Sequence, residues 1–139
     1  IWNQLEYEWN NKFNEYKRLF EENNNNHISI NFDKNPKINI WVTNLRSRYN
    51  QGALSREQIL KLNSINFIWD LKEYFWEENW KKLKIFIEKN GHAKPSALEE
   101  RELNTWVSTQ RADFKQNKMS HKRINKLNNL EGWLWDARK

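Results

Sequence analysis

The sequence of 139 residues has no cysteine, one methionine, three glycines and two prolines. Without cysteine it can form neither disulfides nor thiolate sites, which is compatible with a reducing compartment. The glycines stand apart, at Gly52, Gly91 and Gly132, so there is no glycine-rich phosphate loop. No apolar run approaches the roughly 20 residues that span a bilayer, and no secretory signal is visible. We therefore expect a cytoplasmic protein with no membrane partner.

The side chains that enzymes use are also scarce. Catalysis needs a nucleophile with its base, a matched pair of carboxylates or a metal site. The three histidines, His27, His92 and His121, have no second histidine at helical spacing. A histidine in such a loop can order the loop through backbone hydrogen bonds, or it can contact a phosphate or a base. We expect no catalytic residue, no metal ion and no cofactor in this chain.

Aromatic side chains are abundant. Nine Trp and seven Phe contribute to an aromatic fraction of 14%, while the hydrophobic fraction is only 37%. Disordered chains are poor in aromatic residues, so this composition favours a folded protein whose small core relies on large side chains.

The chain also contains an internal repeat, which is the main guide to its organisation. Many similar residues are separated by a constant offset, because 92 − 27 = 65 and 111 − 46 = 65. The pairs at this offset include His27 and His92, Trp41 and Trp106, Arg46 and Arg111, Tyr49 and Phe114, Ser55 and Ser120, and Leu62 and Leu127. Upstream of the tract Asn23 to Asn26 the offset is 67, since 76 − 9 = 67 for Trp9 and Trp76.

The repeat predicts two units, 3–69 and 70–139. Ile1 and Trp2 match Ile68 and Trp69, the last residues of a copy, so we expect residues 1–2 to be the tail of a preceding repeat. The sequence also lacks an initial methionine, and we interpret it as a fragment of a longer chain.

Each repeat shows three helical patterns. Apolar residues recur every three or four positions, which is typical of helices with one buried face. Polar N-cap residues precede these patterns at Asn3, Asp70, Asn35, Ser96, Ser55 and Ser120. The capping box Ser96-x-x-Glu99 places the start of the second helix of the second repeat, and we expect the segments after His27 and His92 to be extended connectors. The predicted fold is all-α, with two tandem three-helix bundles.

Positive charge is concentrated around the turn between the second and third helices. The net charge is +6, and residues 115–126 contain five Lys or Arg and no acid. Such a run is often a solvated face, but it can also contact phosphates while nearby polar side chains reach bases. For Arg46 and Arg111 two alternatives stay open, stacking within the bundle or contact with phosphate. The candidate nucleic-acid-binding residues are Arg46, Arg48, Arg56, Lys61, His92, Lys94, Gln110, Arg111, Lys115, Lys118, Lys122, Arg123 and Lys126.

The order of these motifs resembles the helicase-associated domain family. The matching residues are Gly91-His92, Leu103-x-x-Trp106-Val107-x-x-Gln110-Arg111, Phe114, Ser120, and the closing Trp133-Leu134-Trp135. The first copy differs, because it has Asn26 before His27, Ile38 in place of Leu103 and Leu45 in place of Gln110.

The resemblance implies small helical bundles that bind nucleic acid, with DNA expected rather than RNA, as a non-enzymatic part of a larger helicase-like protein. The motor and its ATP chemistry would lie elsewhere in that protein. We expect a monomer. The alternative is a protein-interaction module that docks on the motor domain of the same chain or on another partner.

Overall fold

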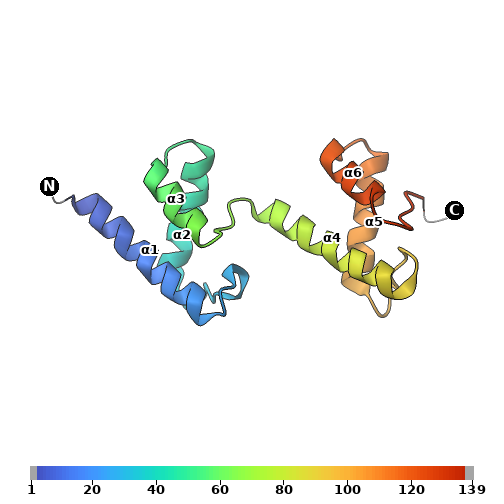
Figure 1. The fold of residues 1–139 in the computed structure, drawn as a ribbon, viewed down its shortest axis with the longest axis horizontal. Coiled ribbons are helices and arrows are strands. Elements are labelled where there is room, and N and C mark those ends of the chain that lie inside the picture. The colour runs from blue at the N-terminus through green and yellow to red at the C-terminus, as the bar shows by residue number, and fades with distance from the viewer. Residues whose placement is uncertain (1–2, 137–139) are drawn as a thin grey trace. The chain divides into compact units, whose positions relative to one another are not determined.

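The computed structural model describes residues 3–136 (Figure 1). These residues form six α-helices and one short 3-10 helix, and none of them forms a strand. The chain divides between Leu71 and Lys72 into two compact parts, which we call unit 1 and unit 2. Each unit contains three α-helices, so the predicted all-α fold with two three-helix units is confirmed. The predicted repeat tail at residues 1–2 lies outside the described residues.

Unit 1 is built from the amphipathic patterns of the first repeat. Its elements are α1 (Gln4–Glu22), η1 (His27–Ser29), α2 (Pro36–Asn50) and α3 (Arg56–Ser64). The Asn3 side chain caps α1 by accepting hydrogen bonds from the backbone N–H groups of Leu5 and Glu6. After α1 the chain reverses through Asn24 and Asn25, whose φ angles of 59° and 57° lie in the left-handed region that asparagine tolerates.

One connector of unit 1 differs from the prediction. The segment after the asparagine tract is a 3-10 helix rather than an extended connector, because the Asn26 side chain accepts hydrogen bonds from the N–H groups of Ile28 and Ser29. The third helix begins as predicted, with a capping box in which Ser55 and Gln58 bond reciprocally.

Unit 2 repeats this order without the 3-10 helix. Its elements are α4 (Leu71–Asn90), α5 (Arg101–Lys115) and α6 (His121–Asn128). The predicted start of α5 at Ser96 is wrong. The Ser96 hydroxyl accepts hydrogen bonds from the N–H groups of Leu98 and Glu99, but these residues form a turn and the helix starts at Arg101. A capping motif can therefore close a single turn when no apolar stripe follows it directly.

Each unit has its own core, formed where its three helices meet. The fully buried side chains of unit 1 include Tyr16, Ile38 and Leu62, and those of unit 2 include Leu83, Val107 and Leu127. Burial of one such aliphatic side chain contributes about 1.5–3 kcal/mol. The side chains that pack inward also fix which faces of the helices remain outside. None of the helices in the described part is long and apolar enough to cross a membrane.

Candidate nucleic-acid interface

The turn between α5 and α6 presents three lysines to solvent. Lys115 ends α5, Lys118 lies in the turn, and Lys122 lies in the first turn of α6. The turn is closed by Asn117, at φ 59°, and by a 2.8 Å hydrogen bond from the Lys118 N–H to the carbonyl of Asp113. Its lysines are therefore held on one well-defined helix–turn–helix edge.

These three lysines are largely free of acidic partners within the described chain. Lys115 and Lys118 form no ion pair with any described residue. Lys122 Nζ lies 3.8 Å from a carboxylate oxygen of Glu73, but its side chain is 71% exposed. An exposed pair at that distance contributes little, so all three ammonium groups remain available to an anion.

Two other cations of the predicted patch are held against α4. Arg123 Nη2 donates to Glu73 Oε2 at 3.0 Å, and its guanidinium lies 5.0 Å from the centre of a Trp76 ring. Lys126 pairs with Glu77 and lies 4.4 Å from the centre of a Trp80 ring. Both side chains thus join α6 to α4, and their charge is partly neutralised.

Arg46 and Arg111 have the same intramolecular role in the two units. Arg46 Nε donates to the carbonyl of Ile68 at 2.8 Å, and Arg111 Nε donates to the carbonyl of Leu134 at 2.8 Å. Each guanidinium also lies over the ring of a core aromatic residue. The distance from the guanidinium carbon to the ring centre is 5.0 Å for Arg46 and Phe67 and 5.2 Å for Arg111 and Trp133. Burial lowers the pKa of both arginines. The arginines bind the closing segment of their own unit, the first of the two alternatives left by the sequence.

Gln110 is one of the predicted nucleic-acid-binding residues. Its side chain lies inside the core of unit 2. Its Oε1 accepts a 2.8 Å hydrogen bond from Trp76 Nε1, and the side chain is buried. A signal for this was present, because Leu103, Val107 and Gln110 follow the spacing of one buried helix face. A glutamine on such a stripe meets the core rather than solvent.

The two repeated histidines occupy different environments. His27 is buried between Tyr16 and the carbonyl of Ile65. His92 is exposed, and its Nδ1 accepts a hydrogen bond from the N–H of Lys94 at 3.1 Å. The exposed side chains of His92 and Lys94 lie on the connector between α4 and α5. This connector precedes α5, whereas the α5–α6 turn follows it.

Unit 1 has its own basic edge, built from other positions. Arg48, Arg56 and Lys61 are exposed, and the first and last of them line one groove of about 530 Å³. Lys61 Nζ donates to the Asn10 side chain at 2.6 Å. Glu6 and Glu57 line the same groove, so its positive charge is diluted.

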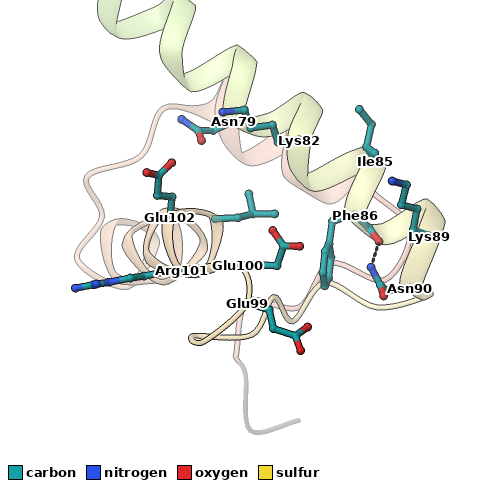
Figure 2. A pocket seen from close by; sticks show the side chains of 11 residues that line it. Asn79, Lys82, Ile85, Phe86, Lys89, Asn90, Glu99, Glu100, Arg101 and Glu102 are labelled. Carbon is teal, nitrogen blue, oxygen red and sulfur yellow. Dashed lines mark hydrogen bonds between the residues drawn. The ribbon is translucent and has the colours of Figure 1, made fainter.

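A second kind of surface lies between α4 and α5. This surface is a groove of about 560 Å³. Figure 2 shows Lys82 and Lys89 of α4 on one side of it and Glu99, Glu100 and Glu102 on the other. Charged side chains of both signs line the groove, and the described residues contain no cluster of His, Asp or Glu that could hold a metal ion. This groove has no arrangement of a nucleophile and a base.

The comparisons with known proteins agree with this geometry. The chain matches the helicase associated domain twice, at residues 6–70 and 73–136. No curated protein and no solved structure gives a match. The two matches cover most of the sequence, each contains three α-helices, and each carries the helix–turn–helix edge described above. The chain belongs to the helicase associated domain family, as two tandem copies of a domain that accompanies helicases.

Proposed function

We propose that this chain binds nucleic acid, DNA in preference to RNA, through phosphate contacts made by the basic edge of each unit. The basic edge of unit 2 consists of Lys115, Lys118 and Lys122, and that of unit 1 of Arg48, Arg56 and Lys61. The observation that carries the proposal is the edge of unit 2, where three exposed lysines stand in a stretch without acids. As an accessory domain without catalysis of its own, the chain would hold the strand while a helicase motor acts on it.

The physical basis is electrostatic. A protein that neutralises phosphates releases condensed counterions, so the logarithm of affinity falls linearly with the logarithm of salt concentration. Each phosphate contact adds about 0.9 to that slope on duplex DNA. Three lysines on one edge therefore predict a slope that drops by about 1 for every lysine removed.

Charge reversal tests the proposal directly. The double variant Lys118→Glu and Lys122→Glu should weaken binding of a fluorescently labelled DNA duplex and flatten its salt dependence, because two phosphate contacts become repulsive. Anisotropy titrations from low to physiological salt measure both quantities. The matched control is Lys82→Glu with Lys89→Glu, which changes the charge by the same amount at the α4–α5 groove. Equal losses in the two double variants would show that only net charge matters and would contradict a defined edge.

A second candidate function is docking on a protein, either the helicase motor or another partner. The α4–α5 groove favours it, because its charged side chains of both signs and the exposed Ile85 resemble the polar rim and apolar contacts of a protein interface. This candidate predicts binding to protein, no affinity for oligonucleotides, and a loss of protein binding on Ile85→Glu. DNA binding that depends on Lys118 and Lys122 would favour the first function.

A further inference from the structure

A partly exposed aromatic stack adjoins the basic edge of unit 2. Phe114, in the last turn of α5, lies against Trp135 with ring centroids 4.0 Å apart and an interplanar angle of 21°. The Phe114 side chain is 37% exposed, whereas the core indoles of Trp76 and Trp133 are 4% and 9% exposed. Phe114 thus lies at the surface, whereas its partner Trp135 is partly buried against the core.

The same stack recurs in unit 1. Tyr49 lies against Trp69 with centroids 4.1 Å apart and an angle of 18°, and the tyrosine is 39% exposed. Both tryptophans are fixed by the same bond, from Trp69 Nε1 to the Asn63 side chain and from Trp135 Nε1 to the Asn128 side chain, each at 2.8 Å. The rings are therefore held in place before any ligand arrives, which lowers the entropic cost of binding.

The surroundings of Phe114 would fit a small flat aromatic group that belongs to a negatively charged ligand. Phe114 borders a pocket of about 240 Å³ together with Met119, His121 and Ile124. That volume is below the ~300–1,000 Å³ of pockets for drug-sized molecules. Lys115 follows Phe114 directly, and Lys118 lies in the turn that forms another side of the pocket region. The exposed part of the Phe114 side chain and two exposed ammonium groups thus lie within a few residues of each other in the sequence.

We propose that Phe114 accepts an unpaired nucleobase of a single strand, a contact that a duplex cannot make. The inference rests on the proposed function, since the lysines of the basic edge hold the phosphates on either side of that base. In a duplex the faces of the bases are covered by their neighbours, and proteins read only their edges in the grooves. In a single strand each base has a free face, and aromatic side chains bind it with little regard to sequence. Tyr49 offers the equivalent face in unit 1.

The test separates base stacking from phosphate contact by the choice of strand. The probes are a labelled oligothymidylate, an abasic strand of the same length and a duplex, each titrated at low and at physiological salt, and the three probes are compared at equal salt. Stacking of a single base on an aromatic residue gives about 5- to 150-fold in affinity. The whole chain should therefore bind oligothymidylate at least about fivefold more tightly than the abasic strand.

Two variants of Phe114 complete the experiment. Phe114→Leu keeps an apolar side chain without a ring and should remove most of that difference, while its affinity for the abasic strand and the duplex stays unchanged. Phe114→Tyr keeps the ring and should retain it. Equal loss on all three probes in Phe114→Leu would indicate a disturbed fold and overturn the stacking role.

The two proposals fail in different ways. If the chain binds oligothymidylate and the abasic strand equally, with the salt dependence of phosphate contact, base stacking is refuted and the proposed function stands. If no probe binds even at low salt, both are refuted.

Discussion

Units 1 and 2 each have three α-helices and a turn between the second and third of them, but the two units bury different polar side chains. In unit 1 the buried polar group is His27, whose Nε2 donates to the Ile65 carbonyl at 2.8 Å while its Nδ1 accepts from the Tyr16 hydroxyl at 2.6 Å. In unit 2 it is Gln110, which accepts from the indole of Trp76. Each unit therefore places one hydrogen-bonded pair in its core, at positions unrelated by the repeat.

This difference in buried polar pairs follows from single substitutions between the two copies of the repeat. Leu83 of unit 2 stands where unit 1 has Tyr16, since 83 − 16 = 67, and without that hydroxyl the second histidine is exposed. Conversely, Leu45 stands where unit 2 has Gln110, and the buried Nε1 of Trp9 has no hydrogen-bond partner among the described residues. The histidine and the tryptophan are thus repeated in both units, but the residue that pairs with each of them is present in only one unit. Whether the repeated side chain forms a buried hydrogen bond therefore depends on that partner residue.

The largest expected effect comes from giving unit 1 the leucine of unit 2. Tyr16→Leu removes a fully buried ring and leaves His27 Nδ1 without its donor. We expect a loss of about 3–5 kcal/mol in the unfolding free energy of unit 1, from the cavity and the unpaired nitrogen together. Amide hydrogen exchange resolved by residue measures this in the whole chain, with unit 2 as the internal reference. A loss below about 1 kcal/mol would contradict the role given to the pair.

The reciprocal exchange concerns the second polar pair and should have a smaller effect. Gln110→Leu leaves Trp76 Nε1 buried and unpaired, and we expect a cost of about 1–2 kcal/mol in unit 2, because new apolar burial offsets part of the penalty. Leu45→Gln supplies an acceptor near Trp9 Nε1 and should change unit 1 by less than about 1 kcal/mol. The same exchange measurement compares both variants. Equal costs would show that the indole bonds do not distinguish the units.

Acid should weaken unit 1 through His27. Burial is the main cause that lowers the pKa of His27 from its ordinary 6.5, and the nearby charge of Arg46 lowers it further. Below pH 6.5 the unfolded chain therefore binds a proton that the folded unit does not. Stability is fully present above pH 6.5, falls as the pH drops toward the folded-state pKa, and becomes level below it.

Denaturant unfolding at a series of pH values, followed by probes in unit 1, measures that slope. His27→Gln should flatten it, and His92→Gln, at the exposed position of unit 2, should leave it unchanged. An unchanged slope in His27→Gln would assign the pH dependence to carboxylates instead.

Most of the fold could be predicted from the sequence, since spacing and capping residues are local signals. The third helices begin at the predicted caps Ser55 and Ser120, and the chain reverses at asparagine and glycine as expected. The start of α5 could not be predicted in this way, because Ser96 forms the same local bonds in a turn as in a helix cap.

The side-chain partners were harder to predict than the helices. That Arg123 and Lys126 face acids of α4 depends on how helices about 50 residues apart in the chain pack together. Sequence analysis could find the cations of the candidate site, but it could not separate the paired ones from the free ones.

The smallest expected effect links stability to binding through one ion pair. Lys126 pairs with Glu77, whereas Lys61, its counterpart in unit 1, donates to Asn10. Asn10→Glu should stabilise unit 1 by about 0.5 kcal/mol and weaken DNA binding, because Lys61 becomes neutralised, while Glu77→Asn should do the reverse in unit 2 by freeing Lys126. Unfolding and anisotropy titrations on the two variants measure both effects, and added salt should shrink them. If Glu77→Asn destabilises unit 2 without raising affinity, Lys126 serves only to hold α6 on α4, and the basic edge of unit 2 ends at Lys122.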